Sequence, residues 1–183
     1  MIVGGMRILR TASSSGPEAV RVNRVAAYTA FAWVMVFLAW HVVWALTGLA
    51  WPEASERHGA ARVVAEAFSV IVLLMVAVGV ALPLALVQAW GRRVPAWMLA
   101  AGVWFGCVLL GARGFSGVAD AIARATGVLP HGLTGMTTEQ VYGSAHPSVW
   151  ARVAGAVTDV MFAVGGVVFG VAGVAFRRVQ RTS

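Results

Sequence analysis

The chain has 183 residues, of which 60% are hydrophobic and 11% are charged, and its mean hydropathy is +0.81. This composition excludes an ordinary soluble domain and is typical of a single-domain polytopic membrane protein. The net charge of +7 comes from 14 arginines without any lysine, but these arginines lie near the ends of apolar runs, which argues against a nucleic-acid-binding protein.

Four long apolar runs predict an all-α fold with four transmembrane helices. About 20 apolar residues suffice to cross the hydrocarbon core of a bilayer, and the first run is too long for the apolar part of a secretory signal. A flexible basic arm, residues 1–25, precedes the runs, a long loop, 114–149, separates the last two, and a basic tail, 177–183, follows them. We expect the helices at about 26–51, 62–90, 95–113 and 150–176.

The arginines predict the orientation of the chain in the membrane. They concentrate in the arm, in the Arg92–Arg93 turn and in the tail, and such segments usually lie in the cytoplasm. We therefore expect both termini on the cytoplasmic side of the plasma membrane and the loops at 52–61 and 114–149 outside. The segment FSGVADAIARA from Phe115 predicts a short surface helix, and the rest of that loop is interpreted equally well as a lid or as a plain connector.

Aromatic residues form a stripe along the first helix. At about 100° per residue, Trp33, Phe37, Trp40 and Trp44 fall on one side, with His41 at the edge. A stripe of this kind is more often a surface on which another helix packs than the wall of a ligand pocket. Both interpretations stay open, because tryptophan faces beside a buried acid also suit the stabilisation of a cation.

Two glycine pairs predict where the third and fourth helices meet. Gly102-x-x-x-Gly106 and Gly166-x-x-x-Gly170 present small residues that let helix backbones approach closely in lipid. Helical periodicity places charged residues of both helices on the same faces as these glycines. We therefore expect the helices to touch in their cytoplasmic halves and to splay outside, leaving a polar pocket that opens outward.

Asp159 is the strongest candidate for a functional residue. A carboxylate at that depth costs about 2.5 to 3.5 kcal/mol to insert and is usually retained for a reason. As a catalytic acid or base it would act with His41, Arg113 and Glu66, which helical counting places in the same outer half. The structural alternative is an ion pair of Asp159 with Arg113 or Arg152.

The other three candidates also have structural interpretations. Glu66 has Arg62 one helical turn away and forms a modest ion pair with it. His41 donates a hydrogen bond across the helices, as lone histidines in membranes usually do. Arg113 lies close enough to the outer boundary to extend its guanidinium to water.

No metal site and no cofactor are expected. His58, His131 and His146 lack the spacing of metal ligands. Cys107 is the only cysteine, which excludes an internal disulfide and a Cys-x-x-Cys redox site. The chain also has no nucleotide-binding motif, so the use of ATP is not expected.

Three segments carry a resemblance to a known family. They are YTAFAWVMVFLAWHVVWALTG from Tyr28, ARGFSGVAD from Ala112 and WARVAGAVTDVMFAVGGVVFG from Trp150. Together they resemble a family of small actinobacterial integral membrane proteins of unknown function, whose most specific feature here is His41-x-x-Trp44. The family often has an aromatic residue where this chain has Val43. The resemblance implies four helices, and no catalytic residue is carried over from it.

Two functions are compatible with these observations. The first is an intramembrane enzyme that applies acid–base chemistry to a small lipophilic molecule, such as an isoprenoid or a polyketide, in a pocket walled by the aromatic stripe. The second is a non-enzymatic protein for binding, export, immunity or complex assembly, in which the same charges hold the helices together. The expected partners are the lipid bilayer, such a lipophilic molecule, and either a second copy or another membrane protein.

Overall fold

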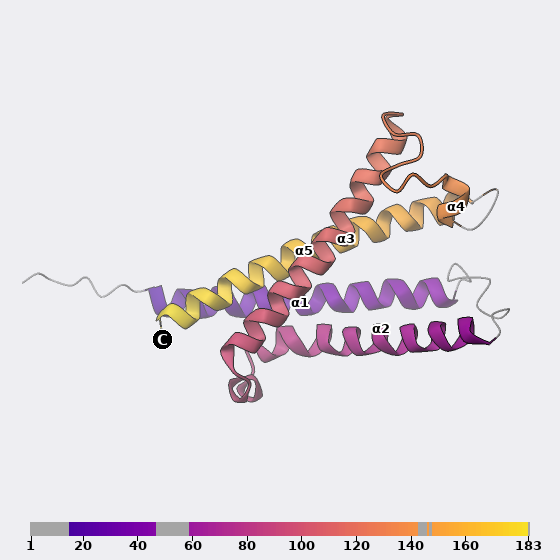
Figure 1. The fold of residues 1–183 in the computed structure, drawn as a ribbon. Coiled ribbons are helices and arrows are strands. Elements are labelled where there is room, and N and C mark those ends of the chain that lie inside the picture. Colours follow the sequence, from indigo (N-terminus) through magenta and orange to yellow (C-terminus); the bar gives the residue numbers. More distant parts are fainter. Residues whose placement is uncertain (1–14, 47–58, 143–145, 147, 183) are drawn as a thin grey trace, which may run out of the picture.

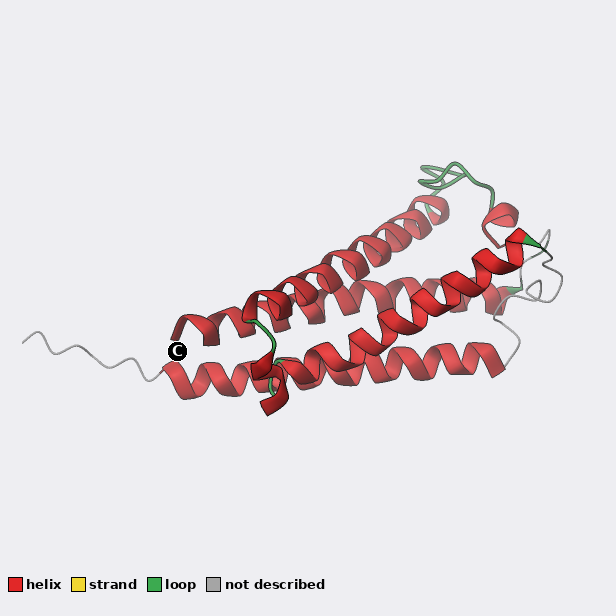
Figure 2. Cartoon of the chain, turned by 60° about the horizontal axis from the view of Figure 1, so that its bottom comes forward, coloured by secondary structure: helices red, strands yellow, loops and turns green. Residues whose placement is uncertain are grey.

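The computed structural model describes residues 15–46, 59–142, 146 and 148–182, and this part of the chain is helical without any strand (Figures 1 and 2). The predicted loop at 52–61 lies almost wholly outside the described residues. The elements are α1 (Ser15–Leu46), α2 (Ala60–Ala85), the 3₁₀ helix η2 (Ala89–Arg93), α3 (Ala96–Ala125), α4 (Thr138–Tyr142) and α5 (Val149–Thr182).

Three of the helices are long and apolar enough to cross a membrane. They contain the segments Gly16–Trp44, Ala96–Ala125 and Val149–Arg181. The prediction of an all-α membrane protein is therefore confirmed. The remaining long helix, α2, has 26 residues and includes the apolar segment Leu74–Ala85.

The helices gather at one end of the bundle and spread at the other (Figure 1). The start of α1, the turn that carries η2, and the end of α5 lie together; we call this the terminal end. At the opposite end, the α4 end, α3 and α5 diverge, and the loop 126–137 and α4 connect them (Figures 1 and 2). Helix α1 runs between α2 and α5, and α3 crosses α5 obliquely (Figure 1).

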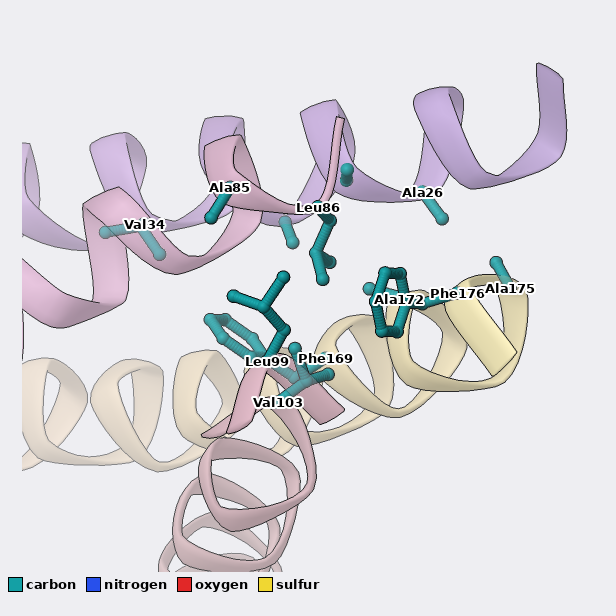
Figure 3. Close-up of a cluster of buried hydrophobic side chains, with 12 residues drawn as sticks. Ala26, Val34, Ala85, Leu86, Leu99, Val103, Phe169, Ala172, Ala175 and Phe176 are labelled. Carbon is teal, nitrogen blue, oxygen red and sulfur yellow. The ribbon is translucent and has the colours of Figure 1, made fainter. Parts of the chain in front are cut away.

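The hydrophobic core lies toward the terminal end, where α1, α2, α3 and α5 all contribute to it (Figure 3). Small residues of α1 and α5 surround the larger side chains, so four backbones converge around a compact centre. Its buried residues are Ala26, Ala27, Ala30, Val34, Ala85, Leu86, Leu99, Val103, Phe169, Ala172, Ala175 and Phe176.

Glycines allow α3 and α5 to cross in backbone contact, but farther along α3 than the sequence predicts. A Cβ on Gly166 would lie 2.6 Å from the Cα of Gly111, and a Cβ on Gly114 would overlap the backbone of Ala163. The prediction that Gly102 packs on the last helix is wrong, because Gly102 faces the side chain of Leu82 in α2. Periodicity identifies the packing face of a helix, but it does not identify which neighbour that face meets.

Three helix boundaries differ from the predicted ones. Helix α1 begins at Ser15, so residues 15–25 are helical rather than a flexible arm, and α5 continues through most of the predicted tail to Thr182. Helix α3 does not end near residue 113 but runs to Ala125 as one helix. Each added segment contacts the rest of the bundle. In α1, Asn23 is buried, and in α5 the Arg177 guanidinium lies 5.3 Å from the Trp104 ring centroid. In α3, Gly114 packs on α5.

The predicted second helix is shorter than expected at its carboxyl end. It stops at Ala85, and Trp90 belongs to η2 rather than to α2. Pro83 lies in the last turn of α2, where its missing N–H removes one helical hydrogen bond. A Cβ on Gly91 would overlap the carbonyl of Ala85, so the chain folds back tightly on the end of the helix.

The crossing of α3 and α5 predicts a difference between glycine positions. Gly114→Ala is expected to destabilise the protein by about 1 to 3 kcal/mol, because the new methyl group overlaps the α5 backbone. Gly79→Ala in α2 is the matched control, since its Cβ would only touch Val34 at 4.0 Å and alanine favours a helix by up to about 1 kcal/mol. Thermal unfolding of both variants in detergent measures this; equal stability would contradict the crossing.

Candidate functional site

An ion pair joins α3 to α5 on the α4 side of their crossing. The Arg113 Nη1 donates to the Asp159 Oδ1 at 2.6 Å. The Asp159 side chain is only 18% exposed, whereas that of Arg113 is 54% exposed. The structure therefore brings these two predicted residues together, and it pairs Asp159 with Arg113 rather than with Arg152.

The backbone of α3 gives the carboxylate its place. Gly117 lies one turn beyond Arg113, and a Cβ on Gly117 would overlap the Asp159 carboxyl group. The Arg113 guanidinium also lies 5.4 Å from the ring centroid of Phe162, on α5. The ion pair is therefore held in one arrangement, because the guanidinium lies over an aromatic ring and the carboxylate packs against a glycine of α3.

Tyr142 belongs to α4 and lies against Gly155, which precedes Asp159 by one turn of α5. Its hydroxyl is 3.0 Å from where a Cβ on Gly155 would stand, so the small residue makes room for the phenol. Burial raises the pKa of the Tyr142 hydroxyl, and the negative charge of Asp159 raises this pKa further. The site therefore combines an anion, a cation and a neutral phenol that is able to donate a hydrogen bond.

The aromatic stripe of α1 packs against α5. The Trp33 ring is stacked on Phe37 at 5.2 Å and meets Phe169 edge-on at 6.1 Å, while Phe37 meets Phe162 edge-on at 5.0 Å. The Trp40 Nε1 donates a hydrogen bond to Thr158. These contacts favour the interpretation of the stripe as a packing surface over its interpretation as a pocket wall.

His41 bonds to its own helix rather than across the bundle. Its Nδ1 lies 2.8 Å from the Phe37 carbonyl oxygen, which accepts only if the Nδ1 carries the proton. Its ring centroid lies 4.1 Å from that of Phe37 and 6.3 Å from that of Trp44. The rings of Phe37 and Phe162 lie one after the other between His41 and Arg113.

Glu66 remains outside this description. It belongs to α2, but its side chain is not among the described ones, so the prediction for Glu66 stays a prediction. Among the described side chains, no three His, Cys, Asp or Glu residues lie close enough together to hold a metal ion.

A second ion pair organises the loop that follows α3. Arg124 Nε donates to Asp120 Oδ2 at 2.6 Å, the Leu133 N–H donates to Asp120 Oδ1 at 2.5 Å, and Arg124 Nη1 donates to the Met136 carbonyl at 2.9 Å. Gly132 is buried against both charged side chains. The loop 126–137 is therefore folded back onto the end of α3.

Sequence reasoning missed two residues of the site. Gly117 was detectable, because it lies four residues after Arg113 and therefore on the same face of the helix. Tyr142 was not, because its position depends on how α4 docks on α5. No protein-family model, curated protein or solved structure matches the chain. The functional argument therefore depends on the geometry of the chain itself.

The ion pair predicts energetic coupling between α3 and α5. In a double-mutant cycle with Asp159→Asn and Arg113→Gln, we expect a coupling of about 1 kcal/mol, kept modest by the exposure of Arg113. The measurement is thermal or denaturant unfolding in detergent at neutral pH. The cycle of Asp159→Asn with Arg152→Gln is the control, and equal coupling in both cycles would show that the contact is only a general charge effect.

The surroundings of Tyr142 predict its titration. In a Tyr28→Phe background, which leaves one tyrosine, the Tyr142 phenol should ionise above its ordinary pKa of about 10, and Asp159→Asn should lower this pKa. Because the folded state holds the phenolic proton more tightly than the unfolded chain, stability should fall as the pH rises above about 10. Ultraviolet absorbance titration measures the pKa; a value unchanged by Asp159→Asn would place the carboxylate too far away.

Proposed function

We propose that this chain is a four-pass protein of the plasma membrane with both termini in the cytoplasm. The apolar helix α2 lies beside α1 and returns the chain to the terminal end, which supports its assignment as a fourth span (Figure 1). The distribution of arginines supports the orientation. The elements at the terminal end carry Arg21, Arg24, Arg92, Arg93, Arg177, Arg178 and Arg181, whereas those at the α4 end carry Arg62, Arg113, Arg124 and Arg152.

Within this protein, the ion pair serves to bind a small lipophilic molecule that carries an acidic group. The observation that carries this conclusion is the asymmetry of the pair: the Asp159 carboxylate is mostly covered, while more than half of the Arg113 side chain is accessible. A guanidinium has five N–H donors, and the carboxylate takes only one of its terminal nitrogens at close range. The remaining donors suit a second carboxylate or a phosphate.

The residues around the ion pair favour binding of the lipophilic molecule over catalysis. A carboxylate held in a salt bridge stabilises the arginine as a cation instead of meeting a substrate. The aromatic residues that a carbocation would require are packed between α1 and α5.

Acid–base catalysis by Asp159 on an isoprenoid-like or polyketide-like molecule is the second candidate. The observation that favours it is the position of the Tyr142 hydroxyl, which lies against Gly155, one helical turn from Asp159 on α5. The phenol is protonated at neutral pH, so it would donate a proton to a basic atom of the bound molecule, and water would reprotonate the phenolate. Its role would be that of a general acid beside an anion.

One experiment separates the two candidates. Wild type, Arg113→Gln and Asp159→Asn are produced at equal membrane levels and purified, and mass spectrometry identifies the lipophilic molecules in each preparation and in each cell extract. We expect wild type to retain an acidic lipophile unchanged and Arg113→Gln to retain about tenfold less of it, because a charge-assisted hydrogen bond is lost.

Arg152→Gln is the matched control, because Arg152 is an exposed arginine of the α4 end outside the ion pair and should retain the molecule fully. A compound whose mass or isomer changes only in cells with wild type would establish catalysis instead. Equal retention by wild type, Arg113→Gln and Arg152→Gln would refute recognition by Arg113 and return the pair to a purely structural role.

A further inference from the structure

A groove at the terminal end is separate from the ion pair. It has a volume of about 810 Å³ and lies between α1, the end of α2, η2, the start of α3 and the end of α5. Buried apolar side chains of Leu86, Leu99 and Phe176 line one part of it. The polar part of the lining consists of two glutamines, one asparagine and three arginines, so the groove has the mixed character of the boundary between lipid tails and headgroups.

The charge of this groove has one sign. Arg24, Arg92 and Arg93 contribute to its lining, and all three are exposed. No carboxylate is among the lining residues that the structure describes. Because two of the arginines come from η2 and one from α1, the tight turn at Gly91 is what brings them to the same opening. Three guanidinium groups around one opening suit a phosphate.

The groove also contains a buried acceptor. Asn23 is 6% exposed and lines the groove, and its Nδ2 donates to the Leu86 carbonyl at 3.3 Å. Its Oδ1 has no hydrogen-bond partner among the described residues. A buried carbonyl oxygen without a hydrogen-bond donor is unfavourable. A hydroxyl group in the groove would supply the donor that the Asn23 Oδ1 lacks.

We propose that this groove binds one anionic phospholipid whose headgroup carries hydroxyl groups, such as phosphatidylglycerol. The arginines bind the phosphate diester, Asn23 accepts a hydrogen bond from a headgroup hydroxyl after a small adjustment of the groove, and the acyl chains leave along the apolar side. The proposal depends on the membrane location of the chain, and it is independent of the molecule that Arg113 binds at the other end.

The test uses the full-length protein purified in a neutral detergent. Binding is measured by native mass spectrometry and by thermal stabilisation with phosphatidylglycerol, phosphatidylethanol and phosphatidylcholine of matched acyl chains. Phosphatidylethanol is the critical comparison, because it has the same phosphate diester charge without a headgroup hydroxyl. We expect phosphatidylglycerol to bind most tightly and phosphatidylcholine most weakly.

Glycerol phosphate without acyl chains should not stabilise the protein, and stabilisation by it would identify a site for a soluble phosphate instead of a lipid.

Paired variants test the assignment of residues. Arg92→Gln/Arg93→Gln should weaken phosphatidylglycerol binding by about tenfold or more. Arg177→Gln/Arg181→Gln removes the same charge from the same end but outside the groove, and it should retain the binding of wild type. Equal losses in both double variants would overturn the proposal, because they would show a general attraction between the basic end and anionic lipid.

Asn23→Leu tests the hydroxyl contact. It should abolish the preference for phosphatidylglycerol over phosphatidylethanol while leaving the preference of both over phosphatidylcholine. A wild type without the first preference would overturn the role of the hydroxyl. Retention of the lipophile that Arg113 binds is measured in the same preparations, so loss of binding at either end is recognised separately; unchanged retention there in Asn23→Leu also shows that the variant is folded.

Discussion

The backbone contact between α3 and α5 is the constraint on which the other features depend. In lipid, the hydrophobic effect does not drive helices to associate, so close packing and polar contacts must hold them together. Here Gly111 and Gly114 lie against Gly166 and Ala163, and this crossing sets how far apart the two helices are on either side. Toward the terminal end the space admits the core side chains, and toward the α4 end it admits an ion pair.

The ion pair shows how a membrane protein accommodates charge. Asp159 is covered by Gly117, whose missing side chain leaves room for the carboxyl group, and it is neutralised by Arg113. Arg113 in turn lies over Phe162. Each partner lowers the cost of placing the other away from water, yet the arginine stays accessible because α3 and α5 diverge there. The same divergence leaves room for the charged side chains at the α4 end.

The two ends of the bundle differ in the polar groups that they present. At the α4 end a single cation is held by a carboxylate and bordered by the phenol of Tyr142, which suits one acidic group on a lipophilic molecule. At the terminal end three arginines surround a groove with the unpartnered Asn23 oxygen, which suits a hydroxylated phosphodiester. Between the two ends, the aromatic stripe of α1 packs on α5.

Sequence by itself determined the all-α membrane class, the apolar runs, and the faces of α3 and α5 on which Arg113 and Asp159 lie, because hydrophobicity and the 3.6-residue period are local properties. It did not determine which helix each face meets. Only the tertiary structure decided that Gly102 faces α2, that the aromatic stripe packs on α5, that α3 continues to Ala125, and that Tyr142 lies against Gly155 of α5. These features depend on contacts between residues far apart in the chain, and helical periodicity carries no information about distant neighbours.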